Sequence, residues 1–146
     1  MLAITILCVG RLKERFYTDA CSEYLKRLSA YSKTEIIELK EGTPDEEKRI
    51  REAFPKGAIL IALCIEGEQM KSEEFAGRIS RWQVNGASRL CFIIGGSNGL
   101  PEAVKKLAQE RLSLSEMTFP HNLARVVLLE QIYRAFQIIE GGKYHK

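Results

Sequence analysis

The stretch "FIIGGSNGLPEAV" (residues 92–104) runs from an apolar, strand-like segment through a glycine-rich turn into a segment with helical spacing. Three glycines within five residues let the backbone adopt positive φ and approach a ligand closely. The G-G-x-x-G spacing is not that of a dinucleotide-binding loop, and no lysine follows the last glycine as in a phosphate-binding P-loop. The stretch therefore indicates either a plain strand-to-helix turn, with Pro101 at the first helical position, or a loop that holds a ligand by backbone and shape.

The same order of strand, turn and helix recurs along the chain. Apolar runs predict buried strands at 2–9, 57–65 and 89–94, with a shorter strand at 34–39. Between them, helical spacing predicts helices within 11–31, 43–54 and 72–84, the last capped by Ser72. This alternation predicts an α/β fold with a parallel sheet and helices on both faces. Ligands bind beyond the carboxyl ends of such strands, where the turns at Gly67 and Gly95 are expected.

The last third of the chain departs from this regular pattern. A short helix is expected near 101–109, and residues 112–119 read as a short strand that ends in a loop. The helix expected from about 120 to 139 is apolar over most of its circumference and is followed by Gly141 and Gly142. One sheet face cannot cover such a helix, so either the core surrounds it or a second subunit covers it. For so small a chain we favour a homodimer.

Length and composition narrow the class of protein further. A chain of 146 residues predicts a single domain over 1–146, and no apolar run is long enough to cross a membrane. Four cysteines without C-x-x-C spacing read as small core residues in a reducing cytoplasm, and with only two histidines a metal site is not expected. The net charge of +3 permits a polyanionic partner without requiring one.

Three separated motifs, in order, carry a resemblance to a known family. They are "IIGGSNGL", "LSLSEMTFPHNLARVVLLEQIYRAFQI" and the terminal "YHK". Together they resemble the bacterial ribosomal RNA large subunit methyltransferase H family, and the resemblance spans essentially the whole chain. It implies the SPOUT fold with a C-terminal trefoil knot, a feature that a pattern of strands and helices would not suggest. It also implies methyl transfer from S-adenosylmethionine to N3 of a pseudouridine in 23S rRNA, performed by a homodimer on the 70S ribosome.

The resemblance implies a cofactor site with no metal. Its members would be Leu63, Gly95, Leu114, Ser115, Glu116, Met117, Thr118 and Phe119. Because S-adenosylmethionine carries no phosphate, it needs no P-loop lysine and can be held by backbone groups and apolar walls. Without the resemblance, the run 114–119 would read as a strand end with ordinary turn chemistry.

The C-terminal segment supplies the expected catalytic residues. His145 is the candidate base because imidazole gains and loses a proton near neutral pH, whereas the phenol of Tyr144 is the weaker candidate. Arg134 is expected either to contact the RNA near the cofactor or to pair with Glu130 one helical turn away. His121 reads as a residue at a helix start, and the tail itself could be no more than a solvated basic segment.

RNA contacts are expected from a modest basic set on both subunits. Its members are Arg11, Lys13, Arg15, Lys143 and Lys146. Pairing with nearby carboxylates is the alternative interpretation of these charges. Two other functions stay open: methylation of another RNA position or of a small molecule, and binding of cofactor or RNA without catalysis.

Overall fold

The structure, a computed structural model, describes residues 1–145, so Lys146 of the basic set and of the "YHK" motif lies outside the described residues. The strands are β1 (Leu2–Val9), β2 (Ser32–Leu39), β3 (Ile59–Glu68), β4 (Arg89–Ile94) and β5 (Glu110–Leu112). The helices are α1 (Arg15–Leu28), α2 (Glu46–Glu52), α3 (Ser72–Val84), α4 (Glu102–Leu107) and α5 (His121–Ile139). Apart from the strand expected within 112–119, the strands and helices expected from the sequence are present, within a few residues at their ends.

The five strands form one sheet in the order β2-β1-β4-β3-β5, and every neighbouring pair is parallel. This confirms the predicted parallel α/β sheet. The short strand expected within 112–119 instead covers Glu110–Leu112, and the chain from 113 to 120 is loop. Parallel strands place all their carboxyl ends at one edge, which collects the loops after β3, β4 and β5.

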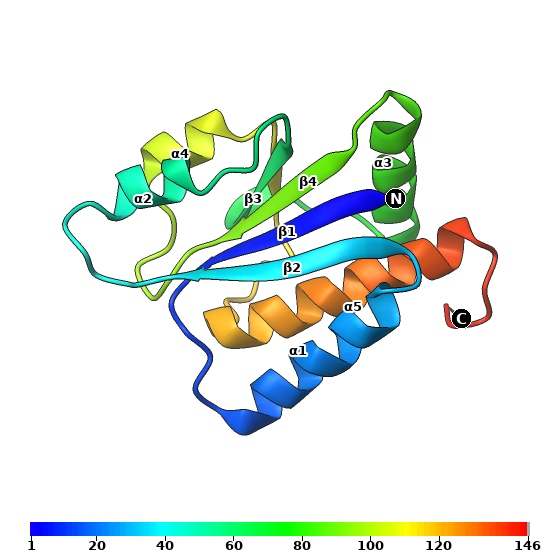
Figure 1. Cartoon of the computed structure of the whole chain (residues 1–146), viewed down its shortest axis with the longest axis horizontal. Coiled ribbons are helices and arrows are strands. Elements are labelled where there is room, and N and C mark those ends of the chain that lie inside the picture. Colours follow the sequence, from blue (N-terminus) through cyan, green and yellow to red (C-terminus); the bar gives the residue numbers. More distant parts are fainter. Residues whose placement is uncertain (146) are drawn as a thin grey trace.

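Helices cover both faces of the sheet, as Figure 1 shows: α1, α3 and α5 lie on one face, and α2 and α4 on the other. Successive side chains of β1 alternate between the two layers, as expected for a strand. Ile6 packs toward α1, α3 and α5, whereas Leu7 packs toward α2 and α4, and both are fully buried. A strand buried on both sides must be apolar at nearly every position, which is the pattern seen in residues 2–9.

Helix α5 lies beneath the sheet between α1 and α3 (Figure 1). Leu128, Leu129 and Ile132 have no exposed surface in the single chain. The core therefore surrounds the most apolar part of this helix, which is the first of the two arrangements that the sequence allowed. Burial in one chain does not test the homodimer, which stays a prediction.

Two further features bear on the class of protein. Cys8, Cys21 and Cys91 are buried and Cys64 is half-buried, and all four are free thiols. Within residues 1–145, no helix combines the length and apolar character that a membrane crossing needs.

Candidate functional site

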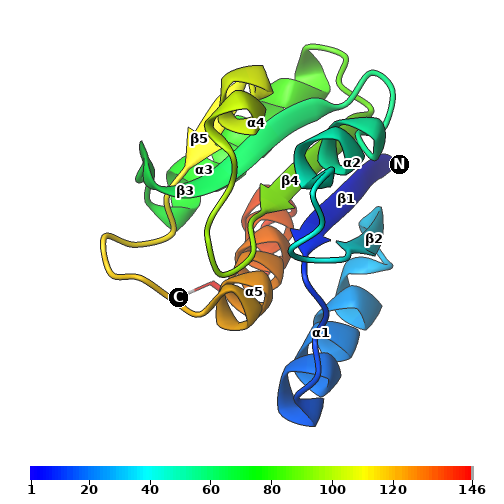
Figure 2. The same ribbon diagram turned by 90° about the vertical axis from the view of Figure 1, so that its left-hand side faces the viewer.

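A pocket of about 700 Å³ opens at the carboxyl edge of the sheet, toward which Figure 2 looks. Its walls come from the end of β3, the turn after β4, the loop between β5 and α5, and the start of α5. The structure brings seven of the eight residues expected at the cofactor to this one pocket: Leu63, Gly95, Leu114, Ser115, Met117, Thr118 and Phe119. Glu116 is the exception, because it lines a separate shallow hollow beside Lys71 and Glu74.

The glycine turn after β4 is closed by its own backbone. A Cβ on Gly95 would lie 2.5 Å from the carbonyl carbon of Gly99 and 2.7 Å from the nitrogen of Leu100, so no larger residue fits. Gly99 has a φ of +73° and donates its N–H to the carbonyl of Gly96 at 3.0 Å. Within this turn, positive φ is therefore needed at Gly99. Gly95 is needed for a different reason, because the backbone of the turn leaves no room for a side chain there, with or without a ligand.

The loop between β5 and α5 makes ordinary turn contacts and also forms part of the pocket wall, which are the two interpretations given for residues 114–119. Ser113 Oγ donates to the carbonyl of Ser115 at 3.0 Å, and Ser115 Oγ accepts from the N–H of Met117 at 3.0 Å. These are local turn contacts of a familiar kind. The same residues line the pocket, so turn chemistry fixes the shape of this wall.

A charged pair at the pocket wall was not expected from the sequence. Lys105 reaches the pocket from α4, and its Nζ lies 2.6 Å from Oε1 of Glu66. The hydrogen bond between them raises the pKa of Lys105 and lowers the pKa of Glu66. Sequence reasoning considered only the residues directly after the turn, where no lysine stands, and so did not find Lys105. Lys105 lies six residues after Gly99 and one helical turn into α4.

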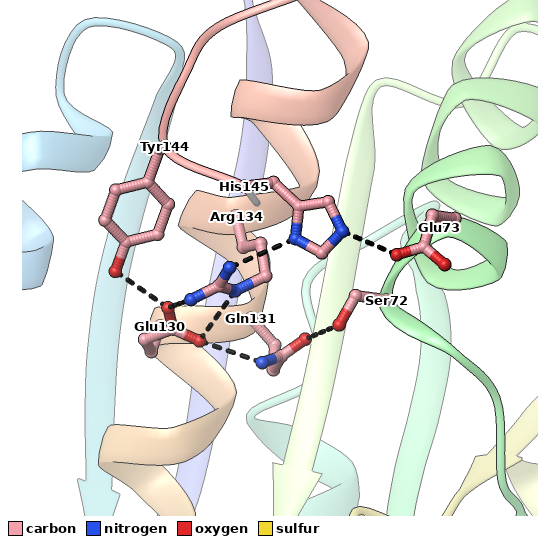
Figure 3. A network of polar contacts seen from close by, with 7 residues as sticks. All are labelled: Ser72, Glu73, Glu130, Gln131, Arg134, Tyr144 and His145. Atoms are coloured by element: carbon pink, nitrogen blue, oxygen red, sulfur yellow. Dashed lines mark hydrogen bonds and ion pairs between the residues drawn. The ribbon is translucent and has the colours of Figure 1, made fainter.

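The three candidate catalytic residues form a second cluster at the far end of α5, shown in Figure 3. Arg134 pairs with Glu130 at 2.7 Å, so the predicted contact between neighbouring helical turns is present. His145 lies between Arg134 NH1, 3.0 Å from its Nδ1, and Glu73 Oε1, 2.6 Å from its Nε2. Tyr144 donates its hydroxyl to Glu130 at 2.8 Å. The tail is therefore docked on α5 and α3. It is not the solvated segment that was one interpretation of the sequence.

The surroundings of Tyr144 and Ser72 bear on Tyr144 as a candidate base and on Ser72 as the expected helix cap. Burial and the hydrogen bond to Glu130 raise the pKa of Tyr144 well above its ordinary value, so its phenol keeps its proton near neutral pH. Ser72 is the first residue of α3 and makes no capping contact there. Its hydroxyl instead donates to Oε1 of Gln131 at 2.7 Å, which links α3 to α5 beside the tail (Figure 3).

The pocket and the tail cluster are separate within one chain. None of Arg134, Tyr144 and His145 lines the pocket, whereas Ala124 on the same helix does. Arg134 lies ten positions after Ala124, which at 1.5 Å per residue is about 15 Å along α5. Among residues 1–145 no cluster of three or more histidine, cysteine, aspartate or glutamate side chains is arranged to hold a metal ion.

Comparison with known proteins agrees with this arrangement of strands and helices. The family model "Predicted SPOUT methyltransferase" matches residues 2–145. A solved structure of a probable methylase family protein from Haemophilus influenzae Rd KW20 has a similar fold, with a TM-score of 0.60 at 10% identity over 98% of this chain and 70% of that one. The fold is thus that of a SPOUT-class protein.

Curated relatives identify the family within that class. This chain is 48% identical to ribosomal RNA large subunit methyltransferase H from Bifidobacterium animalis subsp. lactis and 46% identical to that from Bacillus pumilus. It is 44% identical to that from Listeria monocytogenes, and each match covers 98% of this chain and 99% of the relative. The chain therefore belongs to the SPOUT methyltransferases and, among them, to the ribosomal RNA large subunit methyltransferase H family.

Proposed function

We propose that this chain transfers a methyl group from S-adenosylmethionine to N3 of a pseudouridine in 23S rRNA on the assembled ribosome. The observation that carries the proposal is the pocket, where seven of the eight residues implied for the cofactor meet. Relatives that are 44% to 48% identical over nearly their full length are named as methyltransferases of large-subunit ribosomal RNA, which supports the substrate class.

The pocket has the size and chemistry that S-adenosylmethionine requires. Its volume of about 700 Å³ falls within the range of small-molecule sites. Leu63, Leu114 and Phe119 provide apolar walls that exclude water, and the two loops offer backbone groups to an adenine ring. Lys105 and Glu66 offer opposite charges to the carboxylate and ammonium of the methionine end. When bound, the cofactor supplies an electrophilic methyl group on its sulfonium.

The acceptor needs help that the pocket residues do not supply. N3 of a pseudouridine is a weakly acidic imide nitrogen, so removing or sharing its proton favours methyl transfer. His145 is the residue we propose for that role, with Tyr144 and Arg134 orienting the ring and the acceptor base. Because the tail is about 15 Å from the pocket along α5 of its own chain, we propose that it acts on the pocket of a partner subunit.

A homodimer would bring the two clusters together. Two large exposed apolar side chains support an interface that includes them: Phe16 at the start of α1 is 66% exposed, and Met117 in the loop before α5 is 77% exposed. Leu128 and Ile132 are core residues, so charge at either would report on folding rather than on dimerisation. Phe16→Glu should instead shift the sedimentation of the protein toward a monomer while its circular dichroism is kept, and an unchanged dimer would place the interface elsewhere.

We also propose that residues 1–146 form one cytoplasmic domain whose C-terminal segment threads the trefoil knot of the family. Support for threading comes from the path of the chain, which leaves β5 at one edge of the sheet and returns as α5 on one face of the sheet (Figure 2). Refolding after full denaturation should then be slow and governed by threading. Refolding as fast as that of an unknotted sheet of this size would contradict the knot.

Methyl transfer to purified ribosomes tests the proposed function. The protein is incubated with isotopically labelled S-adenosylmethionine and ribosomes from a strain that lacks the enzyme, and 23S rRNA fragments are then analysed by mass spectrometry. The proposal expects one labelled pseudouridine. Label at another nucleotide would favour a different RNA position, and cofactor binding without transfer to ribosomes would favour a non-catalytic module.

A further inference from the structure

A second cleft shares a wall with the cofactor pocket. Its volume is about 380 Å³, and it lies between the loop after β1, the loop after β2 and the start of α5. His121 lines both the cleft and the pocket, so the two hollows meet at this side chain. Gly10 forms part of the cleft wall, where a Cβ would lie 3.7 Å from Nε2 of His121. The cleft therefore opens beside the place where a methyl donor would bind.

The charges around this cleft are not balanced among themselves. Arg11, Lys13 and Lys40 line it, are exposed, and form no ion pair within the described part of the chain. The two carboxylates of the cleft, on Glu14 and Glu41, are instead occupied by neutral donors of the protein itself.

Both carboxylates have identifiable partners. Oε2 of Glu41 accepts from the N–H of Ser97 at 3.2 Å and from its hydroxyl at 3.1 Å. Oε2 of Glu14 accepts from Nδ2 of Asn122 at 3.3 Å. The three cations outnumber the two carboxylates of the cleft by one charge, so the cleft favours an anionic ligand, and Glu41 ties the cleft to the glycine turn of the cofactor pocket.

We propose that this cleft binds a backbone phosphate of the RNA next to the acceptor nucleotide, with His121 between that phosphate and the methyl donor. The inference rests on the proposed function, because it takes the acceptor to be a nucleotide. A base can reach a donor in a pocket only if it leaves the stack, and its own phosphates then lie within one nucleotide of the pocket mouth. Cations on flexible side chains around a concave site suit such a phosphate.

Matched pairs of lysines provide the test. In the cleft variant, Lys13→Gln and Lys40→Gln remove two positive charges. In the control variant, Lys33→Gln and Lys56→Gln remove the same charge from exposed positions that do not line the cleft. Two quantities are measured for each protein: the salt dependence of binding to a fluorescent single-stranded RNA oligonucleotide, and the KM and kcat of methyl transfer to ribosomes.

The cleft variant should lose about 0.7 in the slope of log K against log salt for each charge removed, and its KM for ribosomes should rise about tenfold. Its kcat and its affinity for S-adenosylmethionine should match those of wild type. The control variant should behave as wild type in every assay.

Three results would overturn the inference. Equal behaviour of the cleft and control variants would remove the phosphate from this cleft. A raised KM for ribosomes with unchanged RNA binding would assign the cleft to a ribosomal protein instead. Absence of salt-dependent RNA binding by wild type would also refute it. By contrast, RNA binding through the cleft without methyl transfer to ribosomes would contradict the proposed function alone.

Discussion

Nδ1 of His145 lies 3.0 Å from NH1 of Arg134. A guanidinium can only donate hydrogen bonds, so this ring nitrogen accepts, and the proton of the ring lies on Nε2, which faces Glu73 at 2.6 Å. Both nitrogens are therefore occupied while the tail is docked. His145 can take a proton from a substrate only at Nδ1 and only after Arg134 releases that nitrogen, which makes the docked tail a resting arrangement of the proposed base.

The first prediction separates a chemical role of His145 from a structural one. His145→Gln keeps an acceptor for Arg134 and a donor for Glu73, whereas His145→Ala keeps neither. If His145 is the base, both variants should lose about 10²- to 10⁴-fold in turnover on ribosomes, with affinity for S-adenosylmethionine unchanged. Full turnover of the glutamine variant, beside a defective alanine variant, would show that the residue only holds the tail.

The second prediction concerns the glycine turn. Gly95→Ala should open the turn and weaken cofactor binding, because its Cβ would meet the backbone of Gly99 and Leu100. Gly99→Ala is the matched control: the space around it is open, and its cost is the left-handed φ, about 1 kcal/mol. Calorimetric titration and thermal unfolding should therefore rank Gly95→Ala as the more damaging change, and the reverse ranking would contradict this account of the turn.

The third prediction uses Cys64, a half-buried thiol at the pocket wall. Burial raises its pKa, so it should react slowly with a maleimide, and Cys8 and Cys91 more slowly still because burial raises the pKa of each to about 12. S-adenosylhomocysteine should protect Cys64 by covering it. Mass spectrometry of the labelled protein would detect this, and an equal labelling rate with and without the ligand would place the cofactor elsewhere.

The fourth prediction concerns the partly buried ion pair between Arg125 and Glu38, whose NH1 and Oε2 atoms lie 2.6 Å apart. Burial alone would raise the pKa of Glu38, but hydrogen bonds from Arg125 and from the N–H of Leu12 outweigh it, and the pKa lies below its ordinary value of 4.5. The stability this carboxylate contributes is present above pH 4.5 and is lost as the pH falls through its lower folded value.

Arg125→Met should remove that contribution. Since the Glu38 side chain is 33% exposed, water relieves part of the loss, and the free energy of unfolding at pH 7 should fall by about 2 to 3 kcal/mol. The variant should also lose less stability than wild type on acidification. Parallel stability curves of the two proteins between pH 7 and pH 3, measured by urea denaturation, would contradict this role of the pair.

The sheet could be predicted from the sequence because its central strands are buried on both faces. The runs at 2–9 and 89–94 are apolar at nearly every position, and the structure places strands at those same residues. The role of residues 114–119 as a pocket wall was predicted only through the family resemblance. The residues alone did not indicate it, because their serine contacts are ordinary turn chemistry. Lys105 and His121 were missed as wall residues because their positions depend on how α4 and α5 meet loops distant in sequence. The docking of His145 on Glu73, 72 residues away, is equally non-local.

The central claim is that a pocket and a tail from different subunits form one active site, and mixed dimers test it most directly. His145→Ala disables the tail, and Ala124→Phe fills the pocket, with Ala103→Phe on the exposed side of α4 as a control for the added ring. Each disabled homodimer should be inactive on ribosomes. When the two are unfolded together and refolded at equal amounts, activity should return to about one quarter of wild type, because half the dimers are mixed and each has one complete site. No recovery of activity in mixtures shown to contain mixed dimers would contradict the claim and confine each site to a single chain.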